Sequence, residues 1–502
     1  MRQTELKTAA EWAKQGKYEE AYDLSYKWLK SDPNDADALN NIAYIMLNTD
    51  KCAIAYPILK QVTAMAPKSA LGWLNMGMCC SDLWRLKEAR RAYRKGIACA
   101  TTPEQESMLN VNMSSLLVDH GNFEEAEPFC HRAIELNPDS VKGKANLGFC
   151  QLAQRNWAEG WKNYRYCMNS EWRPITQYNN EPLWTGSEKG KICIVSEQGL
   201  GDEISFGQMV PDMQAWCDEN DSQLVLDVNP RLENLFKRSF PDTEVHGTRG
   251  IKRITWDCRD IDYSLPMAQL GEYFRCREDQ FTGEPYLVAD PDRVLQWKAL
   301  FETKGKPIIG LGWRGGIWKT AAKYRQLDLE QLYPVLKSVD AHYVSLQYKQ
   351  SQHEIDYFRQ QHPEIDIVEY AHCTLSTDYD DTVAMIAAMD MVVTMQTTVV
   401  HVAGGLGIPC WTFVPKTSQW RYGQTGEDFP WAKSVRLIRQ EERGLWTEIM
   451  ERTGKELANY RGLPKAAAAN ARKQKDQLRH RGRKVRGNSG RHDRSDGDRA
   501  PA

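Results

Sequence analysis

Proline and small residues recur along the first third of the chain with a period of about 34 residues. Prolines close four successive segments, at Pro33, Pro67, Pro103 and Pro138. A small residue recurs in the second half of each unit; these residues are Ala21, Ala55, Ala89, Ala126 and Gly160. Proline ends a helix and a small residue lets two helices approach closely, so the pattern predicts a series of helix–turn–helix units.

After Trp172 and Pro174 the pattern changes to short, β-branched apolar runs, each followed by a turn and then a helical pattern. The first series has strand candidates in KICIVSEQ, SQLVLDVN and near TEVHGT. A helical segment, DRVLQWKALFETKGK, leads to a second series with strands in PIIGLGW, AHYVSLQY, IDIVEY, DMVVTMQ and IPCWTFVP. Two such series predict two doubly wound α/β domains that face each other across a cleft.

We therefore expect four parts: an α-helical solenoid over residues 1–172, α/β domains over 173–290 and 291–463, and a basic tail over 464–502. Residues 471–502 hold eleven Lys and Arg against four Asp and Glu, without any aromatic residue. This composition predicts a disordered, solvated tail, with weak binding to anionic lipid or nucleic acid as the alternative.

Composition narrows the class of protein. The chain is 41% hydrophobic and 26% charged with a formal net charge of −2, which is typical of a globular protein and gives no strong nucleic-acid or membrane signal outside the tail. Its thirteen cysteines include no C-x-x-C, so neither a disulfide framework nor a structural zinc site is expected. Without an apolar signal segment or a long apolar run, the sequence predicts a cytoplasmic protein.

In α/β sheets of this kind, ligands bind beyond the carboxyl ends of the strands. The first strand end carries Gly199 and Gly201, which would let the backbone approach a ligand, followed by Asp202 at a helix start. Asp202 is either a helix-capping residue or, in a cleft, a general base. A dinucleotide fingerprint would need a third glycine where the chain has Ile204, so an oxidoreductase is disfavoured.

Two strand ends in the second series suit phosphate groups. One loop combines glycines with the cations Arg314, Lys319 and Arg325, which fits a diphosphate, although an ordinary basic loop is the alternative. The other strand end runs from Gln396 into a helix whose N-terminal amides could cradle phosphate oxygens, with His401 one turn further in. A single helical histidine is more often structural.

Two further motifs have competing interpretations. Asp378-Tyr379-Asp380 resembles a metal-binding D-x-D, but it precedes a helical run, so we predict capping by Asp380 or Asp381. Trp420-Arg421-Tyr422 follows the last apolar strand, where it would either stack on a base or sugar or pack against protein.

The repeated segments GKYEEAYDLSYKWLKSDP, LKEARRAYRKGIACATTP and GNFEEAEPFCHRAIELNP resemble tetratricopeptide repeats, of which about four and a half would cover residues 3–170. Such arrays present an extended surface to protein segments. The repeats are thus expected either to bind a partner or acceptor, or merely to support or dimerise the rest of the chain.

The segments EQGLGDEISFGQMVPDM, LGWRGGIWKT, YVSLQY, DDTVAMIAAMDMVVTMQTTVVHVAGGLGIPCW and QWRYG, taken in order, resemble a glycosyltransferase domain that follows such repeats in many bacterial proteins. That domain is similar to the heptosyltransferases (glycosyltransferase family 9) and, more distantly, to O-GlcNAc transferase. The resemblance implies a GT-B fold and inverting, metal-independent transfer from a nucleotide-sugar donor to a protein or glycan acceptor, without a cofactor.

The resemblance also implies residue roles. Asp202 would deprotonate the acceptor hydroxyl, and donor binding would involve Gly199, Gly201, Arg314, Lys319, Arg325, Gln396, Thr397, Thr398 and His401. The last four match D-[ST]-x-x-x-H, except that Gln396 replaces an aspartate expected to face the sugar. Glutamine supplies no charge, so a catalytically silent GT-B-like scaffold that acts through its repeats is the alternative function.

Overall fold

The computed structural model describes residues 1–170, 173–251, 254–302, 304–316 and 325–462. Lys319 and the basic tail therefore lie outside the described residues, and the predictions about them stay predictions. Within residues 1–170, helices follow one another as α1 (Arg2–Lys14), α2 (Tyr18–Ser31), α3 (Ala36–Leu47), α4 (Cys52–Met65), α5 (Ala70–Asp82), α6 (Leu86–Cys99), α7 (Pro103–Asp119), α8 (Phe123–Leu136), α9 (Val141–Ala153) and α10 (Trp157–Tyr164).

The recurring prolines lie at or just before helix starts that are capped by side chains; Pro103 is itself the first residue of α7, after the cap Thr102. Two residues after Pro33 the Asp35 carboxylate accepts hydrogen bonds from two backbone N–H groups of α3, and two residues after Pro67 the Ser69 hydroxyl accepts one from α5. Ser140 caps α9 in the same way. Each such cap pairs a backbone donor that the first turn leaves without a partner, so the repeat is encoded locally in the sequence.

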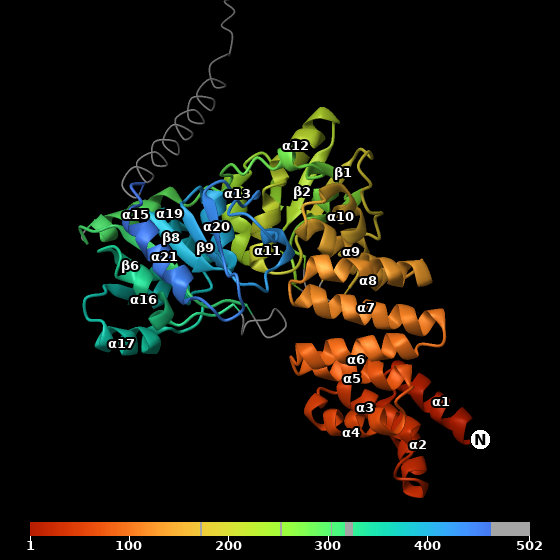
Figure 1. The fold of residues 1–502 in the computed structure, drawn as a ribbon. Helices are drawn as coiled ribbons and strands as arrows, with labels where there is room; N and C mark the ends of the chain where they lie inside the picture. Colours follow the sequence, from red (N-terminus) through yellow and green to blue (C-terminus); the bar gives the residue numbers. More distant parts are fainter. Residues whose placement is uncertain (171–172, 252–253, 303, 317–324, 463–502) are drawn as a thin grey trace, which may run out of the picture.

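The repeat helices form two layers. The odd-numbered helices α1, α3, α5, α7 and α9 contact one another in series. Each of α2, α4, α6 and α8 packs mainly between two odd-numbered helices, and α10 packs against α9. The recurring alanines are fully buried, and a Cβ on Gly160 would come within 2.8 Å of the Leu152 side chain and 2.9 Å of its backbone nitrogen. The small residues thus permit close helix packing, as predicted. Figure 1 shows the array extending away from the α/β region.

The first sheet has the order β3-β2-β1-β4, with all neighbours parallel. Its strands are β1 (Lys191–Val195), β2 (Gln223–Asp227), β3 (Glu244–His246) and β4 (Tyr263–Pro266). Around it lie α11 (Leu200–Gly207), α12 (Val210–Glu219), α13 (Glu233–Ser239) and α14 (Gly271–Phe274). The strand order reverses between β1 and β4, so the carboxyl end of β1 is a topological switch point.

The second sheet has the order β10-β9-β8-β5-β6-β7 and is also parallel throughout. Its strands are β5 (Ile308–Gly312), β6 (His342–Ser345), β7 (Ile367–Glu369), β8 (Met391–Met395), β9 (Cys410–Val414) and β10 (Val435–Arg439). The helices are α15 (Pro291–Glu302), α16 (Leu329–Leu336), α17 (Gln352–Gln361), α18 (Ala371–Thr374), α19 (Tyr379–Ala387), α20 (Thr398–Leu406) and α21 (Thr447–Ala458). Its switch point lies between β5 and β8.

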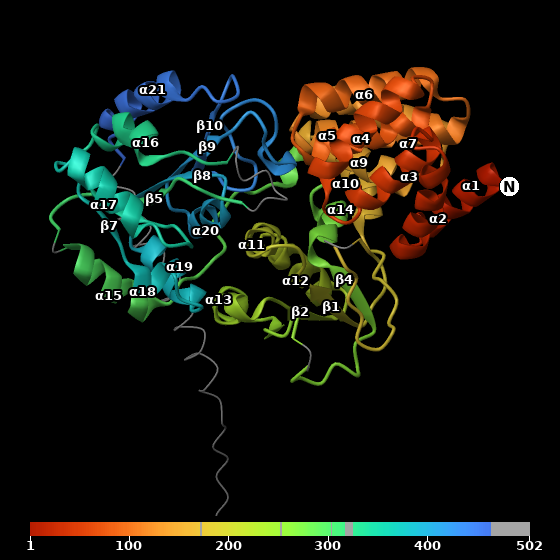
Figure 2. The same cartoon turned by 90° about the horizontal axis from the view of Figure 1, so that it is seen from below.

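The prediction of a helical repeat array followed by a parallel-sheet α/β region is confirmed. One apolar cluster runs from the repeats through the first sheet into one side of the second, and a separate cluster fills the other side of the second sheet. Helix α11 packs directly against α20, so the carboxyl ends of β1 and β8 lie close together (Figure 2). None of the helices in the described ranges combines the length and apolar character needed to cross a bilayer.

The predicted capping role of Asp380 and Asp381 is wrong. Asp378 occupies the N-cap position of α19. Asp380 instead forms a bidentate ion pair with Arg238, and Asp381 accepts a hydrogen bond from the Trp297 indole at 2.9 Å. Tertiary partners that the local pattern does not reveal therefore engage both carboxylates. In the described part of the chain no group of three or more His, Cys, Asp or Glu residues is arranged to hold a metal ion.

Candidate functional site

Asp202 lies in the first turn of α11, directly beyond the carboxyl end of β1. One carboxylate oxygen accepts a hydrogen bond from the Gly199 N–H at 2.9 Å, so the residue does stabilise the start of the helix. The other oxygen lies 2.5 Å from the Arg421 guanidinium. The Asp202 side chain is 24% exposed and that of Arg421 only 5%. Asp202 thus combines a capping role with an ion pair between the two α/β domains.

Arg421 sets the ionisation of this carboxylate. Burial raises the pKa of Asp202, but the charge and hydrogen bond of Arg421, together with the Gly199 N–H, outweigh it and hold the pKa below its usual value. Asp202 is therefore ionised at neutral pH. The same interactions weaken it as a base, so proton abstraction from a substrate would be easier if Arg421 moved onto an anionic group of that substrate.

The loop that carries Arg421 is packed rather than open. Trp420 is buried against Trp161 and Tyr164 of α10, with ring centroids 5.6 and 5.7 Å apart. Phe206 of α11 and Trp431 complete the same aromatic cluster. Of the two interpretations of the Trp-Arg-Tyr segment, packing is the one observed in this structure. The cluster joins the last repeat helices to both α/β domains at the site.

His401 faces this cluster from α20. Its Nε2 atom lies 3.3 Å from the Tyr422 hydroxyl, and its ring is close to Gly201 of α11. Burial lowers the pKa of His401 to about 3. The positive charges of Arg421 and Arg325 also lower this pKa, whereas the negative charge of Asp202 raises it. The imidazole is therefore neutral and offers a hydrogen bond rather than a positive charge.

This ionisation predicts a pH-dependent stability. Unfolding exposes His401. Between about pH 6.5 and the lowered native pKa, the unfolded chain therefore binds a proton at this residue and the native protein does not. The free energy of unfolding falls as the pH falls through this range. Between about pH 7.5 and 5.5, the free energy of unfolding of wild type should fall by about 1 kcal/mol more than that of His401→Gln. Urea denaturation at the two pH values measures both changes. His131→Gln, at a mostly exposed histidine, serves as the control and should keep the wild-type dependence. Equal losses in all three proteins would contradict the prediction.

The residues at the start of α20 are held by contacts between strand ends. Thr397 is the N-cap, and its hydroxyl accepts a hydrogen bond from the Val399 N–H at 3.3 Å. A Cβ on Gly201 would lie 3.0 Å from the Thr398 hydroxyl, and one on Gly315 would lie 2.4 Å from the Thr397 methyl group. The close approach that we predicted for Gly201 is therefore made to α20. Contact of these residues with a ligand stays a prediction.

Gln396 is the least satisfied side chain of the site. It is fully buried at the end of β8, and in the described part of the chain neither its amide oxygen nor its amide nitrogen has a hydrogen-bond partner. Leaving a buried donor and acceptor unpaired costs about 1–3 kcal/mol for each group. The position that the heptosyltransferase resemblance places at the donor sugar thus holds a buried polar group that a ligand or water would satisfy.

The two described cations of the predicted diphosphate loop behave differently. The Arg325 guanidinium is buried and donates to the Gln396 backbone carbonyl, and burial lowers its pKa. Arg314 instead forms an ion pair with Glu354 at 2.5 Å, and Glu354 also accepts a hydrogen bond from Trp313. Arg325 therefore belongs to the cluster with Asp202, His401 and Arg421, whereas Arg314 is directed to α17.

A second buried ion pair, which the sequence did not reveal, supports the loop before α11. Glu197 and Arg173 form two contacts of 2.8 Å, with both side chains almost completely buried. Arg173 also lies over the Tyr164 ring and donates to the Tyr164 carbonyl. The next residue, Gln198, has a positive φ of 64° and donates to the Tyr164 hydroxyl at 3.2 Å. The repeat array thus fixes the backbone that leads to Asp202.

Comparison with known proteins supports the repeat assignment. Residues 109–140 match the family model described as tetratricopeptide repeat. The chain is 28% identical over 449 residues to "Protein FlbA" of Caulobacter vibrioides, a match covering 85% of this chain and 74% of that protein, so it extends beyond the repeats.

Solved structures similar to the chain include a tetratricopeptide-repeat protein from Thermus thermophilus, with 19% identity, coverage of 34% of this chain and 92% of that chain, and a TM-score of 0.30. Another is pilF of Pseudomonas aeruginosa, with 14% identity, coverage of 48% and 93%, and a TM-score of 0.33. The prediction of tetratricopeptide repeats is confirmed by the family match, and these repeats are typical of protein-binding arrays.

Proposed function

We propose that the chain is a glycosyltransferase with a GT-B fold, which transfers a sugar from a nucleotide-sugar donor to a protein or glycan acceptor with inversion and without a metal. The observation that carries this proposal is the cluster of Asp202, Arg325, His401 and Arg421. It forms where the carboxyl end of β1 in one parallel sheet meets those of β5 and β8 in the other. These are the ends at which α/β sheets bind their ligands.

Each member of the cluster has a role in the proposed reaction. Asp202 would take the proton of an acceptor hydroxyl as the oxygen attacks the anomeric carbon. The departing nucleoside diphosphate gains negative charge, which Arg325 and the N–H groups at the start of α20 would stabilise. Arg421, freed from Asp202 when the diphosphate binds, would add a second positive charge and leave the carboxylate more basic.

The alternative function is a catalytically silent scaffold that acts through its repeats. The ion pair between Asp202 and Arg421 favours it, because each group already neutralises the other. Gln396 also favours the scaffold, because the heptosyltransferases that the chain resembles carry an aspartate at this position. The two functions differ in whether the chain binds a nucleotide sugar at all.

A thermal-shift titration separates them. Because a ligand that binds only the folded state raises its stability, we expect one of UDP, ADP, GDP or CMP, or a sugar conjugate, to raise the melting temperature of the full-length protein with increasing concentration. At a ligand concentration about 100-fold above Kd the gain would be about 2.7 kcal/mol. No shift with any of these ligands would favour the scaffold.

The variant Gln396→Leu sharpens this test. The leucine side chain has a similar volume but no polar atoms. It removes two buried groups that have no partner among the described residues, so it should not lower the melting temperature in the absence of ligand. We expect it to keep the shift caused by the nucleotide alone and to lose the additional shift caused by the sugar. An unchanged response to the sugar conjugate would remove Gln396 from the donor site.

A further inference from the structure

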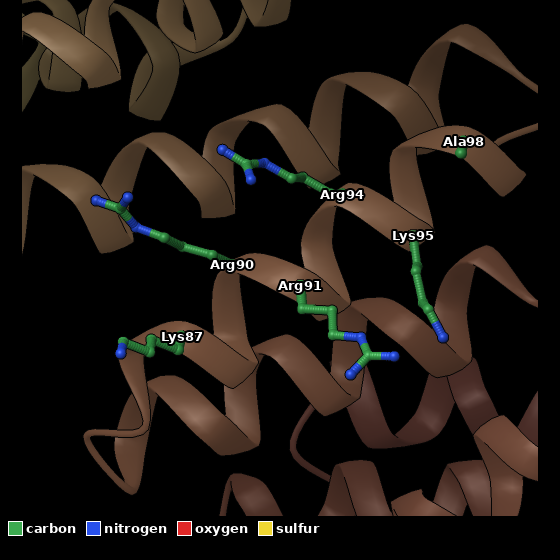
Figure 3. A pocket seen from close by; sticks show the side chains of 6 residues that line it. All are labelled: Lys87, Arg90, Arg91, Arg94, Lys95 and Ala98. Carbon is green, nitrogen blue, oxygen red and sulfur yellow. The ribbon is translucent and has the colours of Figure 1, made fainter.

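A concentrated positive charge lies on the layer of even-numbered repeat helices, away from the site described above. Five cationic side chains of α6 surround a shallow hollow of about 430 Å³: Lys87, Arg90, Arg91, Arg94 and Lys95. Their spacing of three and four residues places them on one side of the helix. Figure 3 shows them fanning out from this face, with Arg90 and Arg94 directed toward one edge and Arg91 and Lys95 toward the other.

Neighbouring groups neutralise this charge only in part. The Glu125 carboxylate of α8 lies 2.9 Å from Arg90 and 3.7 Å from Arg94, so two cations share one acid. Lys95 lies over the Trp73 ring, with its ammonium group 4.2 Å from the ring centroid. Among the described residues, neither Lys87 nor Arg91 has an acidic partner within 4.0 Å.

The one acid of α6 itself does not balance the cations. Glu88 accepts a hydrogen bond from the Tyr56 hydroxyl of α4 at 2.7 Å and lies 3.4 Å from Arg85. Like charges spaced by four residues on a helix destabilise it by about 0.2–0.5 kcal/mol for each pair. The sequence of α6 contains three such pairs, so its charge pattern does not serve helix stability.

Helices α4 and α8, which flank α6, differ in the charge of their side chains. Helix α4 contains no acidic residue among its 14 and exposes apolar side chains, with Ile54 55% and Met65 38% exposed. Helix α8, on the other side, carries Glu124, Glu125, Glu127 and Glu135. The basic surface of α6 thus lies between one helix that has no acidic residue and another that is rich in carboxylates.

We propose that this basic surface of α6 binds a short acidic segment of a partner protein, with apolar side chains of that segment directed toward α4. Carboxylates pair well with arginine because the guanidinium can donate two parallel hydrogen bonds. A bilayer or a nucleic-acid duplex is an extended anionic surface and would also meet the carboxylates of α8, whereas a short segment would not. The proposal is independent of the sugar-transfer function.

Fluorescence anisotropy on the full-length protein tests the proposal. The probe is a fluorescein-labelled peptide of repeated Glu-Glu-Leu triplets, and a peptide of Gln-Gln-Leu triplets is the uncharged comparison. We expect the acidic peptide to bind and the uncharged one not to, with an affinity that falls as salt is added. The double variant Lys87→Glu/Arg91→Glu, at the two cations without acidic partners, should weaken binding by at least about tenfold.

The matched control is Lys7→Glu/Lys17→Glu, which changes the net charge equally at two exposed lysines at the start of the repeats. It should bind the acidic peptide within about twofold of wild type, and both double variants should melt like wild type. The proposal is overturned if the acidic peptide does not bind, or if both variants weaken binding equally. It is also overturned if phosphatidylglycerol vesicles or duplex RNA compete with the peptide more strongly than an excess of unlabelled peptide does.

Discussion

Replacing Asp202 with asparagine is expected to lower the rate of sugar transfer by a factor of about 100 to 10,000, the usual contribution of a general base. This expectation rests on the proposed function. Asparagine keeps the shape of the side chain but accepts no proton from the acceptor hydroxyl. The measurement is the initial rate of transfer at saturating donor, once the thermal-shift titration has identified that donor.

Because Asp202 forms an ion pair with Arg421, the Asp202→Asn variant needs controls that separate a loss of rate from a loss of stability. With asparagine at position 202, the buried Arg421 guanidinium loses its acidic partner, so we expect a lower melting temperature as well as a lower rate. The double variant Asp202→Asn/Arg421→Met removes both charges and should recover much of the stability but none of the rate. Asp242→Asn, at an exposed aspartate, should change neither. Unchanged turnover in Asp202→Asn would exclude Asp202 as the base.

Replacing Arg173 with methionine is expected to lower the free energy of unfolding by about 3–5 kcal/mol, because it leaves the Glu197 carboxylate buried without its partner. The effect should be large since both side chains are almost completely buried and the pair joins the repeat array to the first strand end. Urea denaturation followed by tryptophan fluorescence measures it.

Two further variants identify the cause of that loss. Arg173→Met/Glu197→Leu removes both charges and should recover most of the stability, as expected when the cost comes from an unpaired charge. Arg259→Met breaks an exposed pair with Asp257 and should cost far less stability than Arg173→Met. If Arg173→Met were no more damaging than Arg259→Met, the buried pair would not hold the loop before α11.

The sequence predicted most of the secondary structure but overlooked two strands. Strands β1 to β3 and β5 to β9 lie in the apolar runs that we identified. Strand β4 (Tyr263–Pro266) is short, and β10 (Val435–Arg439) carries two arginines, so neither shows the continuous apolar pattern of a buried strand. They are strands because β4 pairs with β1, which is distant in sequence, and β10 extends the second sheet beside β9.

The structure brings several residues of the predicted site together, whereas their roles in catalysis and donor binding stay predictions. The glycine-rich turn and the helix start after β8 do lie together, because both follow parallel strands at switch points. Asp202, however, is paired with Arg421, a residue that we had assigned only to stacking or packing. Arg314, which we grouped with the phosphate-binding cations, is paired with Glu354. Such pairings depend on how the two sheets are docked, which no local pattern encodes.

The sequence by itself determined the features that arise from neighbouring residues. Prolines and capping side chains set the helices of the repeats, apolar runs set the strands, and the residues after each strand set the candidate chemistry. Only the tertiary structure decided which charges meet, which polar groups stay unpaired and how the repeats contact the site. Ion pairs such as Asp202–Arg421 and Glu197–Arg173 depend on contacts between residues far apart in the chain. So does the burial of the Gln396 amide, which has no partner among the described residues.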